Sequence, residues 1–232
     1  MLQNLNEAVS IRGMSIPLDL GSKGTCQIGG NVSTNAGGLR ALRYGMIGSS
    51  VLGLEVVLAD GTVLDLLNTM RKDNSGYSLK QLFIGSEGTL GIITKVAIQL
   101  VPKPSSTNVI LARVASFPQV LSVIATARQD LAELLSAFEY IDMRSIKVLQ
   151  DCIPQAFNRF KGSGIFRPCI VGPESRTVKE LRIDNFGLAG TAYLVIETSG
   201  FHREYDLERI QSFISKIWNN GKHTFKIIAS NF

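Results

Sequence analysis

The chain has 232 residues, of which 45% are hydrophobic and 19% are charged, and its formal net charge at neutral pH is +5. This length and apolar content suit one large domain or two small ones, and they exclude a disordered, collagen-like or low-complexity protein. The basic excess is spread along the chain, which argues against nucleic-acid binding, and no apolar run reaches the roughly 18 residues of a membrane span.

Histidine, glycine and cysteine are distributed informatively. Histidine occurs only at His202 and His223, which leaves little material for a His-rich metal site, whereas 15 of the 22 glycines precede residue 104. The three cysteines, Cys26, Cys152 and Cys169, are widely spaced and odd in number, and no two of them form a Cys-x-x-Cys motif. This pattern is typical of free thiols in a reducing compartment. The first residues contain no secretory signal and no visible transit peptide, so we expect the chain to begin inside a folded structure.

The first 103 residues predict short elements joined by loops. The expected elements in chain order are a helix over 1–13, a loop over 16–38 with a helical turn from about Asn35, strands over 51–57 and 62–67, a short helix or turn over 78–84, and a strand over 89–100. Asp60-Gly61 between the first two strands is a hairpin signal.

A proline-rich polar segment at 102–106 predicts a boundary between two parts. After it we expect strands over 109–114, 138–141 and 192–197, helices over 117–135, 142–150 and 204–218, and the start of a strand over 223–229. Residues 158–190 have no period and predict a loop. The fold class is therefore α+β, with a mixed or antiparallel sheet in residues 1–103 and, in the second part, helices 117–135 and 204–218 covering one face of the strands.

The densest chemical signal is the segment 28–38, where four glycines accompany Ser33, Thr34 and Asn35. Glycines let the backbone approach a bulky, planar or anionic ligand, and consecutive N–H groups near a helix bind phosphate. A plain tight loop with a helix cap is the alternative interpretation. The pattern is neither a GxGxxG dinucleotide fingerprint nor a P-loop.

Two further motifs follow this segment. Residues 83–94 hold three glycines at three-residue intervals before a buried strand, with Glu87 between them as either a ligand contact or a solvated charge. Arg40, Arg43, Tyr44 and Gly45 come shortly after the first loop. These cations can meet a phosphate or an acidic substrate, or they can simply lie at the surface.

In combination, residues 17–94 resemble the flavin-binding domain of the vanillyl-alcohol oxidase and p-cresol methylhydroxylase (PCMH) superfamily. The matching motifs keep their order and spacing, and they are 30–38, 43–45, 52–61 and 85–91. Within that superfamily the chain is similar to the D-2-hydroxyglutarate dehydrogenase family, to which the runs 71–77 and 136–139 conform. The close similarity covers roughly residues 14–157, and 192–218 more loosely.

The resemblance implies that FAD is the cofactor, bound non-covalently. It implies FAD contacts at these positions: Gly30, Asn31, Ser33, Thr34, Asn35, Gly37, Gly38, Arg43, Tyr44, Gly45, Gly85, Ser86, Glu87, Gly88, Thr89, Gly91 and Ile92. It further implies oxidation of a D-2-hydroxy acid, D-2-hydroxyglutarate to 2-oxoglutarate, in the mitochondrial matrix, with electrons passed to an electron-transfer flavoprotein. It identifies no catalytic residue within this chain.

We expect the chain to depart from the family in three respects. The divalent metal site of the family, built from histidines and a glutamate, has no match here, and neither does the first half of the flavin domain. Residues 158–190 resemble no recognised part of the family. We therefore expect 1–103 to be the C-terminal part of a PCMH-type FAD-binding domain and 104–232 an incomplete substrate domain containing the atypical segment 158–190. Such a chain is expected to be catalytically incomplete, and the alternative is a non-catalytic FAD-binding fragment or interaction module.

Overall fold

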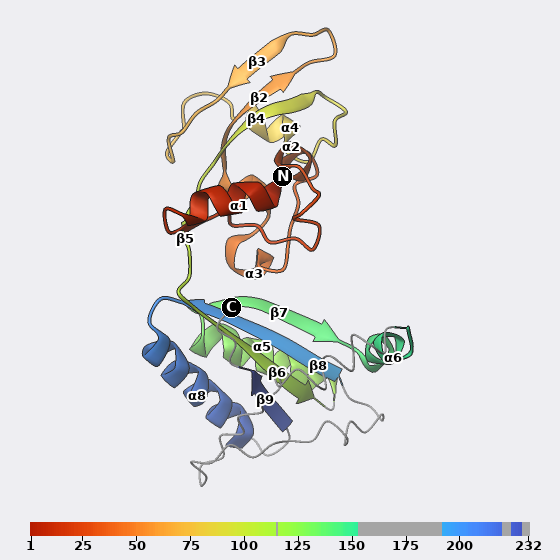
Figure 1. Ribbon diagram of the computed structural model, residues 1–232, viewed down its shortest axis with the longest axis vertical. Coiled ribbons are helices and arrows are strands. Elements are labelled where there is room, and N and C mark those ends of the chain that lie inside the picture. Colours follow the sequence, from red (N-terminus) through yellow and green to blue (C-terminus); the bar gives the residue numbers. More distant parts are fainter. Residues whose placement is uncertain (115, 153–191, 220–223, 229–232) are drawn as a thin grey trace. The chain divides into compact units, whose positions relative to one another are not determined.

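The computed structural model describes residues 1–114, 116–152, 192–219 and 224–228 (Figure 1). Two compact units are present, Met1–Lys103 and Pro104–Phe232, and each is described by itself. The segment 158–190, predicted as a loop, lies outside the described residues, as does His223. Within the described ranges, none of the helices combines the length and the apolarity required to traverse a bilayer.

The first unit is built from short elements around an antiparallel sheet. The elements are α1 (Leu2–Ser10), β1 (Met14–Ser15), α2 (Ile28–Ser33), α3 (Ala41–Tyr44), the 3-10 helix η1 (Ile47–Ser50), β2 (Val51–Val57), β3 (Val63–Leu66), α4 (Lys80–Phe83), β4 (Ile92–Ile98) and β5 (Val101–Pro102). Three strands form a sheet in the order β3-β2-β4, and β1 pairs with β5. All these pairs are antiparallel, which is one of the two arrangements that the sequence left open.

The predicted hairpin is confirmed at β2 and β3, where Val57 pairs with Val63. The Leu58 N–H donates to the Thr62 carbonyl over 2.9 Å, and the Asp60 carboxylate accepts the Thr62 N–H over 2.9 Å. Gly61 has a φ of 85°, a conformation that glycine adopts without steric cost. The Asp-Gly pair therefore closes the turn as its residue types indicate.

The helical turn predicted from Asn35 is wrong in position. Helix α2 spans Ile28–Ser33, and Asn35 follows its end with a φ of 47°. Two glycines in six residues give poor helix propensity, but Val32 is fully buried in the core of the unit. Tertiary packing thus overrides propensity, and a left-handed Asn ends the helix in a position often taken by glycine.

The second unit is a four-stranded antiparallel sheet in the order β7-β8-β6-β9. Its elements are β6 (Ser106–Val114), α5 (Phe117–Asp130), β7 (Leu135–Ile141), α6 (Met143–Cys152), β8 (Ala192–Gly200), α8 (Arg203–Asn219) and β9 (Thr224–Ile228). The strand residues Ile110, Leu194 and Ile196 share one core with Val123 of α5 and Phe213 of α8. The prediction that these two helices cover one sheet face is confirmed (Figure 1).

One helix boundary in this unit was predicted wrongly. The expected helix over 117–135 ends at Asp130, and Leu135 already begins β7. Leu131 and Leu135 continue the helical spacing of apolar residues from Ala127, which is why the periodicity misleads. Both leucines are buried in the core after the chain has left the helix.

Candidate functional site

Two glycine-rich segments that are far apart in the sequence meet at the end of α2. They are residues 28–38, the first loop, which includes α2 itself, and residues 83–94, the second loop. The N–H of Gly85 donates to the carbonyl of Val32 over 3.2 Å, and the N–H of Glu87 donates to the carbonyl of Ser33 over 2.9 Å. The last carbonyls of a helix have no partner within the helix, so these bonds satisfy them. The predicted contact residues of both loops therefore belong to one surface.

Backbone conformation in the second loop is unusual at three neighbouring positions. Gly85, Glu87 and Gly88 have φ values of 78°, 51° and 80°. Glutamate in this left-handed region costs roughly 1–2 kcal/mol relative to ordinary backbone, and such conformations concentrate at functional sites. The hydroxyl and the N–H of Thr89 both donate to the Ser86 carbonyl, over 2.7 and 3.1 Å, and fix the turn.

The first loop is held by its own polar side chains. The Asn35 Oδ1 accepts the N–H of Gly48 over 3.0 Å, and the Ala36 carbonyl accepts the N–H of Ile47 over 2.9 Å. The hydroxyl of Thr34 donates to the Gly30 carbonyl over 3.1 Å. Thr34 and Asn35 were predicted to contact the cofactor through their polar side chains. In the structure the same hydroxyl and amide groups form hydrogen bonds that position the first loop.

The loop glycines differ in what surrounds them. A Cβ atom on Gly38 would lie 1.9 Å from the carbonyl oxygen of Asp19, and one on Gly37 would lie 2.5 Å from the Met46 Sδ. The backbone contact explains the glycine at position 38, whereas at position 37 the flexible end of the Met46 side chain can move aside. A Cβ atom on Gly30 would meet no atom within 4 Å, so the backbone there faces open space that a ligand can occupy.

The polar groups around these loops fit a large cofactor such as FAD. Asn31 is 5% exposed, and its Oδ1 has no hydrogen-bond partner among the described residues; the same holds for the buried Ser86 Oγ. The N–H groups of Gly38, which is half-buried, and of Gly37, which is exposed, also have no partner in the described part of the chain. A buried polar atom without a partner costs about 1–3 kcal/mol, which a ligand with donors and acceptors would recover.

The other predicted contact residues lie on neighbouring elements. Arg43 and Tyr44 belong to α3, and the Arg43 guanidinium lies 5.5 Å from the centre of the Tyr44 ring; Gly45 follows with a φ of 73°. A Cβ atom on Gly91 would lie 2.6 Å from the Val56 Cγ1, so packing against β2 requires this glycine. Ile92 begins β4 and is 63% exposed.

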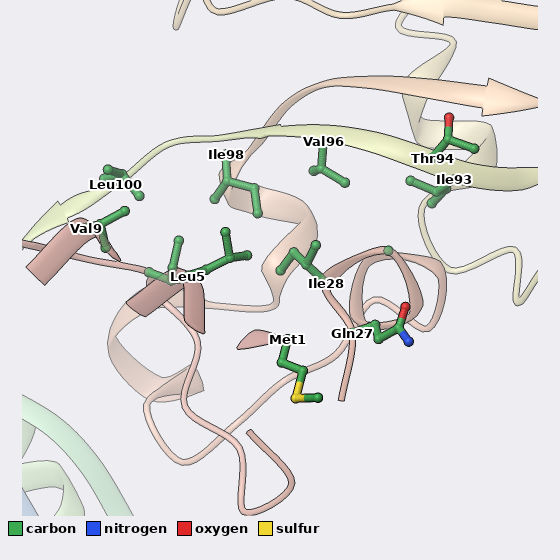
Figure 2. Close-up of a pocket in the computed structure, with 12 residues that line it drawn as sticks. Met1, Leu5, Val9, Gln27, Ile28, Ile93, Thr94, Val96, Ile98 and Leu100 are labelled. Atoms are coloured by element: carbon green, nitrogen blue, oxygen red, sulfur yellow. The ribbon is translucent and has the colours of Figure 1, made fainter. Parts of the chain in front are cut away.

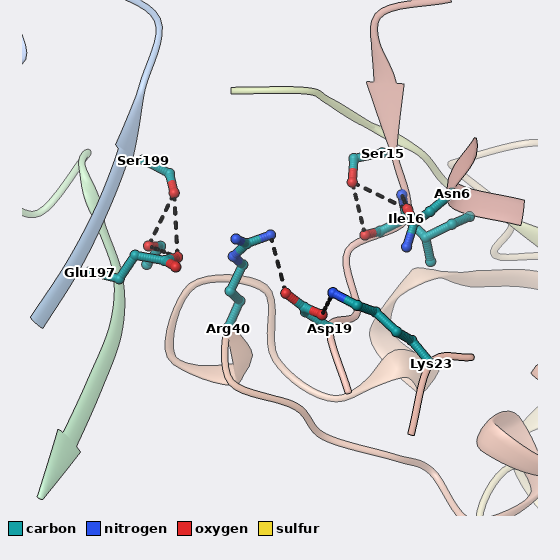
Figure 3. A network of polar contacts seen from close by, with 9 residues as sticks. Asn6, Ser15, Ile16, Asp19, Lys23, Arg40, Glu197 and Ser199 are labelled. Atoms are coloured by element: carbon teal, nitrogen blue, oxygen red, sulfur yellow. Dashed lines mark hydrogen bonds and ion pairs between the residues drawn. The ribbon is translucent and has the colours of Figure 1, made fainter. Parts of the chain in front are cut away.

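Sequence reasoning missed two residues that position the first loop. The Asp19 carbonyl accepts the N–H of Leu39 over 3.1 Å, and its carboxylate pairs with Lys23 at 3.1 Å and Arg40 at 3.7 Å (Figure 3). A Cβ atom on Gly48 would lie 2.7 Å from the Asn35 Oδ1. Gly48 follows the Arg-Tyr-Gly motif closely enough to have been suspected, whereas no sequence signal singles out Asp19.

The second unit contains a buried polar cluster that the sequence did not reveal. Glu197 of β8 is 8% exposed, and its Oε1 accepts the hydroxyl of Ser136 over 2.6 Å. The hydroxyl of Ser199 donates to the Ser136 Oγ over 3.1 Å. These residues come from the adjacent strands β7 and β8, so the sheet itself brings them together.

No metal site is formed by the residues that the structure describes. Within those ranges, no group of three or more His, Cys, Asp or Glu side chains lies close enough to hold a metal ion. His202 is exposed on the turn before α8. The described residues therefore do not fit the divalent metal that the resemblance implies.

Two family models match the chain in succession. Residues 1–67 match the FAD binding domain, and residues 103–230 match the C-terminal domain of FAD linked oxidases. Among solved structures, an alkyldihydroxyacetonephosphate synthase is similar over 100% of this chain and 38% of its own length, with a TM-score of 0.68 and 17% identity. That similarity shows the fold alone.

Curated relatives are much closer in sequence. A probable mitochondrial D-2-hydroxyglutarate dehydrogenase of Oryza sativa subsp. indica is 45% identical over 231 residues, and the mitochondrial D-2-hydroxyglutarate dehydrogenase of Bos taurus is 44% identical over 231 residues. A D-2-hydroxyglutarate–pyruvate transhydrogenase of Saccharomyces cerevisiae is 40% identical over 200 residues, or 85% of this chain and 35% of its own length. The first two alignments cover 100% of this chain but only 37% of each relative.

Proposed function

Because this chain belongs to the family of FAD-linked oxidases, we propose that its two glycine-rich loops hold FAD non-covalently in a dehydrogenase that oxidises D-2-hydroxyglutarate to 2-oxoglutarate. The observation that carries the proposal is the pair of hydrogen bonds from Gly85 to Val32 and from Glu87 to Ser33. They join the two sequence motifs whose resemblance implies FAD contacts. The identity of 45% and 44% to D-2-hydroxyglutarate dehydrogenases supports the substrate.

Different residues have different parts in the proposed site. We assign direct cofactor contact to the backbone at Gly30, Gly37 and Gly38 and to the polar side chains of Asn31 and Ser86, because these groups have open space or no partner. Hydrogen bonds within the chain occupy Thr34 and Asn35, which orient the first loop. The remaining proposed contacts are Ser33, Arg43, Tyr44, Gly45, Gly85, Glu87, Gly88, Thr89, Gly91 and Ile92.

The proposed reaction oxidises the 2-hydroxy acid to the 2-oxo acid: the carbinol carbon loses a hydride, for which bound FAD would be the acceptor, and the hydroxyl group releases its proton to a base or to water. An electron-transfer flavoprotein is the proposed electron acceptor, and the mitochondrial matrix is the proposed location. The chain spans about 37% of the length of its relatives, and its described residues form no metal site. We propose 1–103 as the C-terminal part of a PCMH-type FAD domain, 104–232 as an incomplete substrate domain, and a chain that is catalytically incomplete on its own.

Replacement of Gly30 by alanine tests the cofactor assignment. The added Cβ meets no protein atom, so Gly30→Ala is expected to leave the melting temperature unchanged or slightly raised and to weaken FAD binding about tenfold. Gly21→Ala is the matched control, because its Cβ also points into open space and Gly21 lies outside the two glycine-rich segments 28–38 and 83–94. Flavin fluorescence titration measures both affinities. Equal affinities for wild type and Gly30→Ala, or no FAD binding by wild type, would contradict the assignment.

A dye-reduction assay tests the reaction separately from cofactor binding. With added FAD and D-2-hydroxyglutarate, the 232-residue chain is expected to show little or no turnover, because the described residues provide no metal site. D-lactate and L-2-hydroxyglutarate serve as control substrates. Robust turnover of D-2-hydroxyglutarate would confirm the substrate and show that the chain is not catalytically incomplete. Turnover of a control substrate alone would contradict the proposed substrate.

A further inference from the structure

Cys26 lies just before α2 and carries a free thiol that is only partly buried. Its N–H donates to the carbonyl of Ser22 over 2.9 Å, and its carbonyl accepts the N–H of Leu2 over 3.1 Å, so the backbone around the thiol is fixed. Gln27 and Ile28, which follow it, line an open groove of about 410 Å³ (Figure 2). Small solutes in water can therefore reach this segment of the chain.

One buried side chain is directed at this thiol. Asn31 is 5% exposed, and its Nδ2 donates to the Cys26 Sγ over 3.5 Å. Its Oδ1 is buried and has no hydrogen-bond partner among the described residues, the thiol included. Because Nδ2 and Oδ1 are bonded to the same carbon atom, this acceptor lies beside the sulfur. A buried acceptor without a partner is unfavourable, so any donor that reaches it is stabilised.

Oxidation of the thiol by hydrogen peroxide supplies such a donor. A sulfur electron pair attacks one peroxide oxygen, the S–O bond forms as the O–O bond breaks, and the thiol proton leaves with the other oxygen as water. The product is a sulfenic acid, whose hydroxyl extends the side chain by one atom toward the Asn31 Oδ1. Reduced flavins that react with dioxygen release hydrogen peroxide, so the proposed cofactor is itself a source of this oxidant.

We propose that Cys26 is a peroxide-sensitive modification site, and that its oxidation to sulfenic acid weakens FAD binding through Asn31. The coupling rests on the proposed function, in which the Asn31 side chain contacts FAD. The Asn31 Oδ1 accepts a hydrogen bond either from the cofactor or from the sulfenic acid, so each disfavours the other. Reduction of the sulfenic acid by a thiol restores the original state, because this first oxidation step is reversible.

Mass spectrometry tests the modification site on the 232-residue chain. The protein is treated with hydrogen peroxide and then with dimedone, which reacts with sulfenic acids. A dimedone adduct is expected on Cys26, and added FAD is expected to lower its yield. Cys152 is exposed and serves as the internal control for the peroxide dose. The proposal is overturned if Cys26 carries no adduct at peroxide concentrations that modify Cys152.

Flavin fluorescence titration before and after peroxide treatment tests the coupling. Oxidation is expected to weaken FAD binding by the wild type about tenfold, and dithiothreitol is expected to restore it. Cys26→Ala lacks the thiol and is expected to bind FAD equally well before and after treatment. Cys152→Ala is the matched control, because it removes an exposed thiol of the second unit, and it is expected to respond as the wild type does.

Equal FAD affinity of the wild type before and after peroxide, or an equal loss in Cys26→Ala, would overturn the coupling. The dimedone adduct and the reversal by dithiothreitol are measured on the wild type, so neither depends on the folding of Cys26→Ala. Absence of FAD binding by the untreated wild type would overturn the proposed function and, with it, the coupling. The adduct distinguishes that result, because it reports on Cys26 without FAD.

Discussion

The interactions that stabilise the first unit differ in kind from those that stabilise the second. In the second unit, helices of 14 and 17 residues pack through one continuous core onto a four-stranded sheet. In the first unit, the longest described helix has nine residues, and single backbone hydrogen bonds such as Gly85 to Val32 hold loops in place. The stability of the second unit therefore depends on the volume of apolar side chains that it buries. The loop conformations of the first unit depend instead on a few backbone contacts, which only small residues or residues that accept left-handed backbone allow.

The largest expected effect is in the core of the second unit. Phe213 of α8 is fully buried, so Phe213→Ala is expected to lower the free energy of unfolding by about 3–5 kcal/mol. Urea denaturation followed by circular dichroism measures the loss. Leu121→Ala is the control on α5, where Leu121 is 55% exposed, and a change within about 0.5 kcal/mol is expected. Equal losses in the two variants would refute a volume-dependent core.

In the first unit, Gly38→Ala is expected to act through the backbone. The new Cβ would lie 1.9 Å from the Asp19 carbonyl oxygen, so the loop must move, at a cost of about 1–3 kcal/mol. Gly30→Ala, in open space, is the control and is expected to cause no loss. Thermal melting compares the two variants. A Gly38→Ala protein as stable as wild type would show that the loop adapts freely.

Asn35→Ala is expected to cost less, about 1–2 kcal/mol. It removes the acceptor for the Gly48 N–H, and it places alanine, which tolerates left-handed backbone less well than asparagine, at a φ of 47°. Asn35→Gly restores the backbone freedom but not the hydrogen bond, so its loss should be smaller than that of Asn35→Ala. Thermal melting separates the contribution of the hydrogen bond from that of the left-handed backbone. If Asn35→Gly were less stable than Asn35→Ala, the backbone conformation would not contribute to the loss.

The smallest effect concerns an exposed ion pair in the sheet of the first unit. The hydrogen bond from Lys95 over 2.7 Å, and then that from Thr94, lower the pKa of Glu55 from its ordinary value of 4.5. Because the folded-state pKa is the lower one, this stabilisation is fully present above about pH 4.5 and disappears as the pH falls through the lowered pKa. Glu55→Gln should flatten that part of the stability profile, and an unchanged profile would show that the pair contributes nothing.

The same contrast explains how much of the fold the sequence predicted. A continuous apolar run with β-branched residues located the strand 51–57, and apolar residues at helical spacing located the helices α5 and α8. It failed at α2, where burial of Val32 outweighs two glycines, and at the end of α5, where Leu131 and Leu135 continue the pattern without the helix. A local sequence pattern does not contain information about packing against elements that are distant in the sequence.

The candidate site was predictable as two motifs but not as one surface. Glycines and small polar residues marked each loop, because ligand approach and left-handed backbone both require such residues. The hydrogen bonds that join the loops use main-chain atoms of Val32 and Ser33, whose side chains show no sign of that role. Asp19 was not predicted for the same reason, because its main-chain carbonyl, and not its carboxylate, accepts the N–H of Leu39.

Amide hydrogen exchange with and without FAD tests the central claim most directly. The account predicts that FAD slows exchange together in residues 28–38 and 85–91 and leaves the core strands of the second unit, β6 and β8, unchanged. Gly30→Ala should reduce the protection in both segments at a given FAD concentration. Protection confined to one segment, or absent from both at concentrations that saturate flavin fluorescence, would contradict the single flavin-contacting surface.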